Sequence, residues 1–261
     1  MSLKQAFKTA IATGWDLGGR VARTTPKLTI LYYHAVAPER AQAFDAQMAY
    51  LKRTANLVSA DHTGPLASDR PNVAVTFDDA FRSVRENALP ALIRHQIPAA
   101  IFVPTGYLGR TPGWRMETTG DQTETVMTAE EIAGLPSDLI AIGSHTIDHP
   151  HLTQLSETEV AQQFEASRKT LETLLGRTID TLAFPYGDHN DRVVEQARAA
   201  GYRQVYTVAP QAIGAGDQAT SRGRTSADPA DPAPLFALKS RGAFDWMPLA
   251  SRVKQAIRPR S

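Results

Sequence analysis

The chain contains no cysteine, which excludes a disulfide scaffold, a thiolate metal site and a cysteine nucleophile. It also has little net charge, because 28 Lys and Arg residues oppose 27 Asp and Glu residues. Net charge therefore gives no general argument for nucleic-acid binding. No apolar run approaches the ~18 residues that span a bilayer. The N-terminal segment lacks the unbroken apolar stretch of a secretory signal, since Lys8, Thr9 and Asp16 interrupt it. These absences predict a cytoplasmic protein.

Short apolar runs alternate with segments of helical periodicity along the chain. With 261 residues, of which 42% are hydrophobic, the chain can bury the core of a single domain. The apolar runs that we expect to be buried strands are 28–33, 73–77, 99–103, 138–143, 181–184 and 204–208. Apolar strands that alternate with helices are typical of a parallel sheet. So many units in this length favour an α/β fold, namely a distorted (β/α) barrel.

The two ends of the chain differ from the middle. Residues 1–25 predict an amphipathic helix, because apolar residues recur there at spacings of three and four. We expect the barrel domain over 26–240 and a basic tail over 241–261. Basic amphipathic ends are compatible with peripheral contact to an anionic membrane surface. The alternative is that both ends pack on the domain, as amphipathic surface helices commonly do.

Two segments are longer than connections in a barrel need to be. Residues 104–126 and 209–234 are rich in Gly, Pro and small polar residues, and structureless loops of this length are usually functional or disordered. The first of them follows a predicted strand directly. It should therefore lie on the rim that carries the chemistry in barrel folds.

Polar side chains gather where predicted strands end. These positions are His34 after the first strand, Asp78 and Asp79 after the second, His145 and His149 after the fourth, and Pro185 and Tyr186 after the fifth. In a parallel barrel the carboxyl ends of all strands meet on one face. We therefore expect these residues to form one site, although they are far apart in the sequence.

The residue types at these strand ends suit metal-assisted hydrolysis. Two imidazoles and a carboxylate are a common zinc set, which leaves a position open for water and lowers the pKa of that water to about 7. Adjacent aspartates beyond a strand point in different directions, so one can bind the metal while the other acts as general base. His34 is available as the acid for the leaving group. Each pattern alone is commonly a turn or a helix cap, but their joint occurrence disfavours that explanation.

Three segments carry a resemblance to a known family. TFDDAF (76–81), SHTIDHPHL (144–152) and FPYG (184–187) resemble the first three motifs of the NodB-type polysaccharide deacetylases, carbohydrate esterase family 4. The resemblance covers roughly residues 27–240. It implies metal-dependent hydrolysis of the N-acetyl group of an amino sugar, which releases acetate and leaves a free amine. The implied cofactor is a divalent metal, above all zinc, with cobalt or nickel as alternatives.

The resemblance also implies a role for each matched residue. Asp78 would be the catalytic base. The implied metal ligands are Asp79, His145 and His149. Pro185 and Tyr186 would line the substrate groove, and the Tyr186 backbone N–H would help to hold the oxyanion.

The motif that supplies the acid in this family lies at the other end of the chain. Leu-x-x-His normally stands near the C-terminus, but here no histidine follows His189, and residues 31–34 fit the motif instead. The first and last strands of a barrel are neighbours, so moving the motif between the termini can preserve its position. This arrangement resembles the circularly permuted deacetylases that act on poly-N-acetylglucosamine of biofilms. We therefore expect His34 to be the general acid.

Two further departures concern the base and the apolar wall of the site. The third motif usually begins with an arginine that orients the base, whereas this chain has Ala183 there. The Asp-x-x-Asp-Trp of the fourth motif is missing from its expected place. We expect Trp114, in the first long segment, to form the apolar wall.

The sequence leaves several functions open. The favoured function is deacetylation of a cell-envelope glycan or of its lipid-linked precursor at the inner membrane face. A second is removal of a formyl or another acyl group from a lipid-linked aminosugar by the same site. The contrasting possibility is a non-catalytic glycan-binding module on the same fold, although binding alone does not need both a base and a metal.

Overall fold

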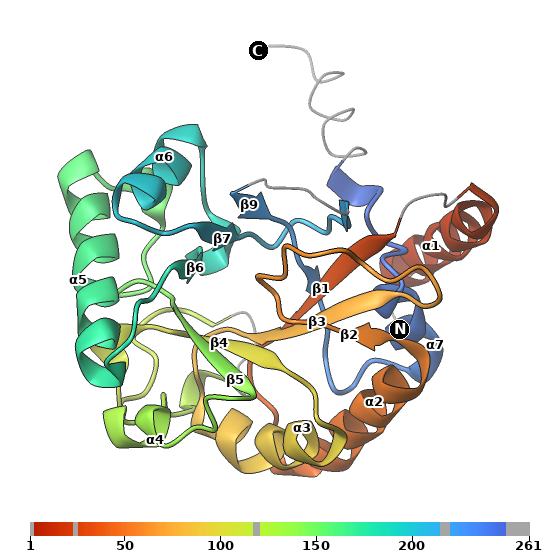
Figure 1. The fold of residues 1–261 in the computed structure, drawn as a ribbon, viewed down its shortest axis with the longest axis horizontal. Coiled ribbons are helices and arrows are strands. Elements are labelled where there is room, and N and C mark those ends of the chain that lie inside the picture. Colours follow the sequence, from red (N-terminus) through yellow and green to blue (C-terminus); the bar gives the residue numbers. More distant parts are fainter. Residues whose placement is uncertain (1–2, 23–25, 117–120, 215–219, 249–261) are drawn as a thin grey trace.

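The computed structural model describes residues 3–22, 26–116, 121–214 and 220–248. Its strands form one sheet that curls into a nearly closed barrel, with helices on the outside (Figure 1). Every neighbouring pair along the main path of this sheet is parallel. The predicted distorted (β/α) barrel is therefore confirmed.

The strands follow one another around the barrel in an order that begins and ends near the C-terminus. That order is β10 (Thr225–Ser226), β1 (Lys27–Tyr33), β3 (Asn72–Phe77), β4 (Ala99–Val103), β5 (Ile140–Ser144), β6 (Thr181–Ala183), β7 (Gln204–Tyr206) and β9 (Ser221–Arg222). Off this path, β2 (Asn56–Leu57) pairs with β3, and β8 (Ile213–Gly214) pairs antiparallel with β1. All the strands expected from apolar runs are present, with small shifts at their ends.

The longer helices lie around the barrel. They are α1 (Leu3–Ala22), α2 (Ala41–Thr54), α3 (Leu89–His95), α4 (Ala129–Ala133), α5 (Glu157–Leu175), α6 (Asp191–Ala199) and α7 (Ala233–Ser240). Helix α5 begins at a capping box, in which the Ser156 side chain accepts from the Glu159 N–H, and it ends before Gly176 in a left-handed conformation.

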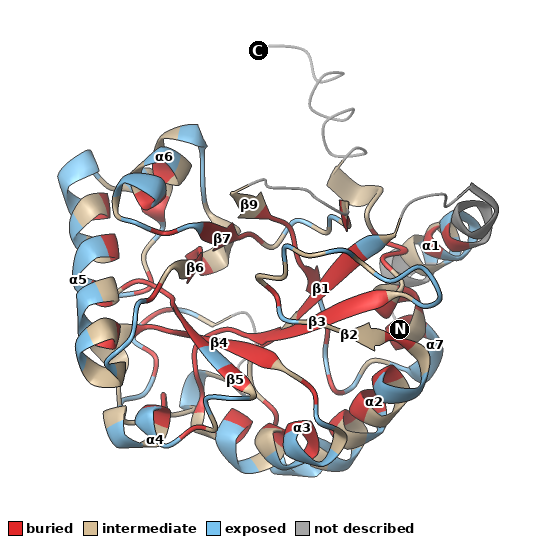
Figure 2. Ribbon diagram, in the orientation of Figure 1, coloured by how far each residue is buried: buried red, intermediate tan, exposed pale blue. Residues whose placement is uncertain are grey.

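Strands β3 and β4 are buried along their whole length and β1 along most of its length, as Figure 2 shows by their red colour. Along β1, Leu31 and Tyr33 pack toward the helices, whereas Leu28 and Ile30 belong to a second cluster inside the barrel. The strand therefore alternates between two apolar surroundings. This double burial explains why the strands appear in the sequence as unbroken apolar runs rather than as alternating patterns.

The barrel closes through a segment that we expected to be a loop without strands. Residues 209–234 contain β8, β9 and β10, each of two residues. Within this segment β9 pairs with β7 and β10 pairs with β1. Strands this short leave no periodicity in the sequence, which is why the expectation was wrong. Gly223 and Arg224 connect β9 to β10.

Helix α1 packs on the domain beside α7. Ala12 is fully buried in an apolar cluster with residues of α7. The Trp15 indole N–H donates to the Asp245 carboxylate over 2.6 Å, and Asp16 forms an ion pair with Arg241 at 3.1 Å. The described part of the predicted basic tail, 241–248, thus lies against α1, and 249–261 are outside the described residues. Within the described part of the chain, no helix is long and apolar enough to cross a membrane.

Candidate active site

The carboxyl ends of β3 and β5 place the aspartates and the first histidine. The backbone hydrogen bonds of the sheet continue beyond the last residue of both strands. The Asp78 N–H donates to Tyr33 O, and the His145 N–H donates to Val103 O, each over 2.9 Å. The chain then turns sharply, since Asp79 has φ of 66° and His149 has φ of 55°. Non-glycine residues in the left-handed region are uncommon and cluster at functional sites. The two loops therefore use strained backbone to aim their side chains.

Asp79, His145 and His149 come together as a possible metal-binding group. One ligand atom from each lies within 4.8 Å of the others, and all three residues are buried. Oδ1 of Asp79 is 3.6 Å from Nε2 of His145 and 3.3 Å from Nε2 of His149. Nδ1 of His145 lies 2.8 Å from the Ala183 carbonyl, which can only accept. Nδ1 must therefore carry the proton, and the Nε2 lone pair is free for a metal.

The charges around these three side chains fit a divalent cation. Burial, followed by the neighbouring charge of Asp78, raises the pKa of Asp79 well above its usual value. Burial also lowers the pKa of His145 to about 4 and that of His149 well below its usual value. Oδ1 of Asp79 has no hydrogen-bond donor among the described residues. A buried carboxylate oxygen facing two neutral imidazole nitrogens is a donor set that a bound cation would satisfy.

Asp78 is oriented by an arginine that the sequence did not predict. Arg224, fully buried on the closing segment, donates from Nη1 to Oδ1 of Asp78 over 2.7 Å and from Nη2 to Oδ2 over 2.8 Å. Its Nη1 also donates to the Thr76 hydroxyl over 3.1 Å. Burial alone would raise the pKa of Asp78, but the charges of Arg224 and His145 outweigh it, and the pKa lies below the usual value. Asp78 is therefore held as a carboxylate with a fixed orientation.

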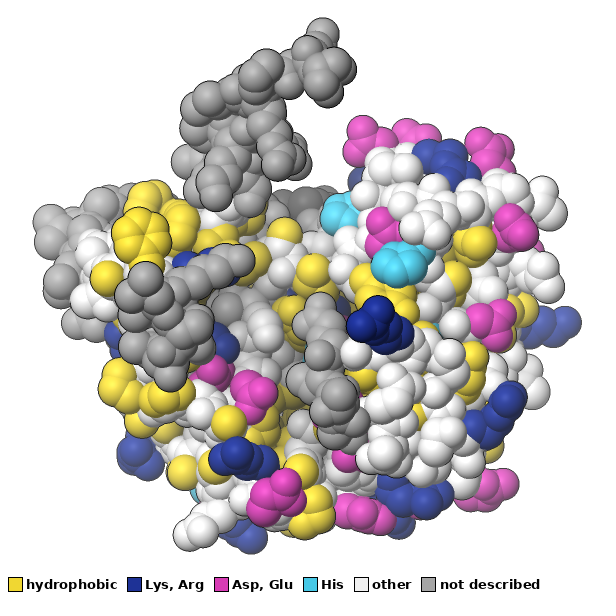
Figure 3. Space-filling view, turned by 180° about the vertical axis from the view of Figure 1, so that it is seen from behind, with side chains coloured by type: hydrophobic (Ala, Val, Ile, Leu, Met, Phe, Trp, Pro, Cys, Tyr) yellow, Lys and Arg dark blue, Asp and Glu magenta, His cyan; other side chains and the backbone are white. Residues whose placement is uncertain are grey.

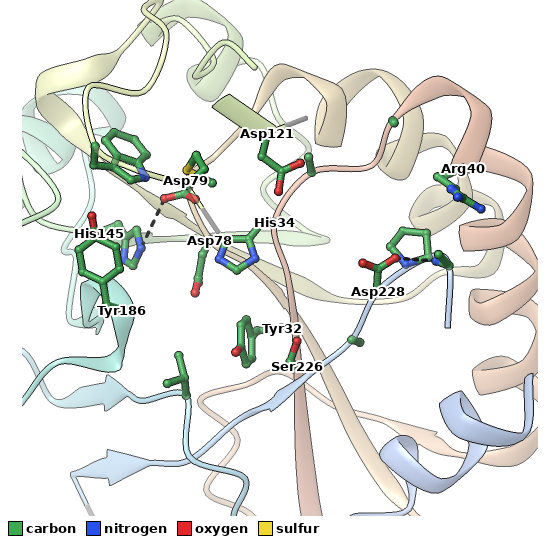
Figure 4. Close-up of a pocket in the computed structure, with 18 of the residues that line it drawn as sticks. Tyr32, His34, Arg40, Asp78, Asp79, Asp121, His145, Tyr186, Ser226 and Asp228 are labelled. Atoms are coloured by element: carbon green, nitrogen blue, oxygen red, sulfur yellow. Dashed lines mark hydrogen bonds and ion pairs between the residues drawn. The ribbon is translucent and has the colours of Figure 1, made fainter. Parts of the chain in front are cut away.

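One cavity of about 520 Å³ joins these groups to residues from other strand ends. Figure 4 shows His34, Asp78, Asp79, His145 and Tyr186 facing it. His34 reaches the cavity from the end of β1, as expected for its predicted role. The cavity continues past His34 to a second end at Arg40 and Asp228, which lie in the loops that follow β1 and β10. Its size is typical of a small-molecule or sugar site.

Aromatic rings enclose the second metal-site histidine. Trp114 stacks on His149, with ring centroids 4.3 Å apart and an angle of 20° between planes. Tyr186 meets the same imidazole edge-on at 4.6 Å. Trp114 and Tyr186 both line the cavity, whereas Pro185 is buried and is not among the lining residues. Proline at the start of the short turn 185–187 fixes the backbone there, and its predicted contact with a substrate stays a prediction.

The chain matches the family model described as "Polysaccharide deacetylase" over residues 67–205, which is more than half of its length. It belongs to the polysaccharide deacetylase family. It is 25% identical over 197 residues to YxkH of Bacillus subtilis (strain 168), a match that covers 71% of this chain and 66% of that one.

Further relatives of this polysaccharide deacetylase family member agree with that assignment. The chain is 25% identical over 150 residues to the poly-beta-1,6-N-acetyl-D-glucosamine N-deacetylase of Staphylococcus aureus (strain MRSA252), which covers 54% of this chain and 49% of that one. The chain thus spans about half to two thirds of the length of these curated relatives. The solved structure of IcaB from Ammonifex degensii has a TM-score of 0.69 and 27% identity, with 82% of this chain and 97% of that chain covered.

Two departures of this chain from the family motifs have a structural explanation. Ala183 stands where the family's motif has its arginine, and its backbone carbonyl instead orients His145. Arg224 reaches Asp78 from a different strand end and gives the carboxylate a bidentate partner. The motif 31–34 covers the end of β1 and the residue after it, beside β10, the closing strand of the barrel.

Proposed function

We propose that this protein hydrolyses the N-acetyl group of an amino sugar in a cell-envelope glycan or in its lipid-linked precursor, and releases acetate. The observation that carries the proposal is the carboxylate of Asp78, held ionised by Arg224 beside the Asp79, His145 and His149 group in one cavity. A binding module needs no such combination of base and metal ligands. The S. aureus relative is a poly-beta-1,6-N-acetyl-D-glucosamine N-deacetylase, which supports the same chemistry.

The proposed reaction assigns one step to each group. When bound by Asp79, His145 and His149, a divalent cation supplies Lewis-acid chemistry, and Zn²⁺ suits two imidazoles and one carboxylate. Asp78 takes a proton from the attacking water, because Arg224 keeps its carboxylate deprotonated and correctly aimed.

Bond cleavage needs groups on the other side of the acetamide. The Tyr186 backbone N–H donates to the developing oxyanion. His34 gives a proton to the departing amine, and its position in the same cavity as Asp78 supports this role. Trp114 forms an apolar wall behind His149, which suits the methyl group of the acetamide.

The Asp78→Asn variant should lose acetate release by roughly 10²–10⁴-fold, the usual contribution of a general base. Asparagine keeps an oxygen for Arg224 but cannot accept the proton from water. The measurement is acetate release from N-acetylglucosamine oligomers, with bound metal determined in parallel. The exposed Asp138→Asn serves as the control and should match the wild type. Formate release from a formylated aminosugar, without acetate release from any acetylated sugar, would contradict the deacetylase proposal.

We further propose that the enzyme is cytoplasmic and meets its substrate at the inner membrane face. On α1, Phe7 and Trp15 keep 68% and 46% of their surface exposed although the helix packs on the domain. Figure 3 shows hydrophobic side chains exposed on the side of the molecule where α1 lies. Exposed aromatic residues on a helix with basic residues are typical of interfacial contact with anionic lipids.

The Phe7→Asp variant should weaken vesicle binding, because it places a charge where an aromatic ring would enter the lipid interface. We expect at least about a fivefold loss of binding to phosphatidylglycerol vesicles, equivalent to about 1 kcal/mol. The measurement is flotation with these vesicles and with phosphatidylcholine vesicles. Thr13→Asp, exposed on another side of α1, is the matched control. A wild-type chain that stays entirely unbound to anionic vesicles would refute membrane contact.

A further inference from the structure

The loop that carries Tyr186 has an unusual backbone that something must hold in place. Tyr186 has φ of 58° and Gly187 has φ of 65°. A left-handed conformation is unfavourable for a non-glycine residue and persists only where its surroundings determine it. Gly187 cannot be replaced without movement, because an added Cβ would meet Val208 Cγ2. The conformation aims the Tyr186 side chain at the cavity (Figure 4).

Asp188, the next residue, connects this loop to the histidine loop. Its Oδ2 accepts the backbone N–H of Thr153 over 2.9 Å. The Thr153 hydroxyl also donates to the same carboxylate, 2.9 Å from Oδ1 and 2.8 Å from Oδ2. Thr153 follows His149 in the loop after β5, whereas Asp188 belongs to the loop after β6. The carboxylate therefore links two strand ends that each deliver a functional residue.

His151 fills the space between the two loops. Its ring stacks on the Tyr186 ring, with centroids 4.1 Å apart and an angle of 14° between planes. Its Nδ1 lies 4.0 Å from Oδ2 of Asp188. The Tyr186 ring also contacts the His149 ring. One continuous set of contacts therefore runs from Asp188 through His151 and Tyr186 to His149.

The usual structural explanation for an aspartate before a helix does not apply here. Helix α6 begins after Asn190, and it is the Asn190 side chain that accepts the capping hydrogen bond from the Val193 N–H. Asp188 makes its side-chain hydrogen bonds to Thr153 instead. Asp188, Thr153 and His151 do not line the cavity.

We propose that Asp188 is a positioning residue, which fixes the Tyr186 amide and ring relative to His149. The inference rests on the proposed function, because the geometry that it protects is that of the deacetylation site. Without the carboxylate, the Thr153 hydrogen bonds are lost and His151 no longer has a partner at its Nδ1 edge. The Tyr186 loop can then leave its left-handed conformation, and the oxyanion donor moves away from its place.

The test compares Asp188→Ala, Asp188→Asn and the control Asp191→Ala, which removes an exposed aspartate from the first turn of α6. We expect kcat for acetate release from N-acetylglucosamine oligomers to fall about 10–100-fold in Asp188→Ala, since a shift of about 1 Å can cost 10²-fold. KM and bound Co²⁺ should stay near wild-type values. Asp188→Asn should recover most of the loss, because its amide can still accept from the Thr153 N–H and donate to the hydroxyl.

A second measurement follows the loop itself without any substrate. Amide hydrogen exchange of residues 184–190 should become faster in Asp188→Ala but not in Asp191→Ala. Unchanged kcat or unchanged exchange in Asp188→Ala overturns the proposal. A loss of Co²⁺ binding that asparagine does not rescue also overturns it, because the role would then be general folding. A wild-type protein that binds Co²⁺ but deacetylates no probe contradicts the proposed function, and the exchange experiment still decides whether Asp188 holds the loop.

Discussion

The His149→Ala variant should lose its divalent metal, whereas the wild-type chain should hold close to one per molecule. Only three side chains form the metal-binding group within the described residues, so removing one leaves two ligands. Replacing a residue that only hydrogen-bonds to a metal ligand typically lowers metal affinity 10–100-fold. We expect removal of a direct ligand to lower the affinity by more than about 100-fold. The measurement is metal content after dialysis, together with competition against a chelator.

A matched variant shows whether the effect is local. His62→Ala removes an imidazole that bonds to Pro65 O outside the cavity and should leave metal content unchanged. Because the pKa of His145 is lowered to about 4, protonation of this ligand should compete with the metal only as the pH falls toward 4, whereas Asp79, with its raised pKa, should take up a proton at higher pH. A folded wild-type chain that binds neither zinc, cobalt nor nickel would contradict the hydrolase, and a glycan-binding module would explain the fold better.

The parts of the site that follow long strands could be predicted from the sequence. Asp79 lies two residues beyond the apolar run 73–77, and His145 lies two residues beyond the run 138–143. These runs are apolar because both faces of a barrel strand are buried. Once those runs are assigned as parallel strands, their carboxyl ends must share one face. The local spacing within each loop then brings His149 to the same place.

Arg224 could not be predicted in this way because nothing local connects it to Asp78, which lies 146 residues earlier in the chain. It stands between two strands of two residues each, and such strands leave no pattern. One signal was present, namely the two arginines that flank Gly223, which are the only basic residues between Arg203 and Lys239. Gly223 is needed because an added Cβ would meet Ala209 O, and this close approach lets the segment cross from β7 to β1.

The packing of α1 was open in the sequence for a different reason. Its apolar spacing suits a lipid surface and a protein surface equally well. The hydrogen bond from Trp15 to Asp245 and the ion pair of Asp16 with Arg241 show that one side of α1 contacts the domain. These partners stand more than two hundred residues apart. Periodicity identifies the apolar side of a helix, but it carries no information about the partner.

The Arg224→Met variant should be strongly destabilised and nearly inactive. Removing one partner of a buried ion pair leaves an uncompensated charge and typically costs about 3–5 kcal/mol in the free energy of unfolding. In this variant burial still raises the pKa of Asp78, but the arginine that lowers this pKa is gone. The acid limb of the pH–rate profile should therefore move to higher pH. Urea unfolding and the pH dependence of acetate release measure the two effects.

The sign of the pH effect on stability should also reverse. In the wild type, the lowered pKa of Asp78 stabilises the fold above the carboxyl's unfolded pKa, and that contribution is lost as the pH falls through the lower, folded value. In Arg224→Met the folded pKa is the higher one, so acidification should stabilise the variant relative to neutral pH.

Two companion variants separate charge from packing. Adding Asp78→Asn to Arg224→Met removes the unpaired charge, so the double variant should regain much of the lost stability while remaining inactive. Arg222→Met removes an arginine that is almost as buried and whose side chain donates, among the described residues, to the Ala60 and His62 carbonyls. It should lower stability without moving the acid limb, because no carboxylate depends on it. If Arg222→Met and Arg224→Met shift the pH–rate profile alike, then Arg224 supports the barrel closure and not the base.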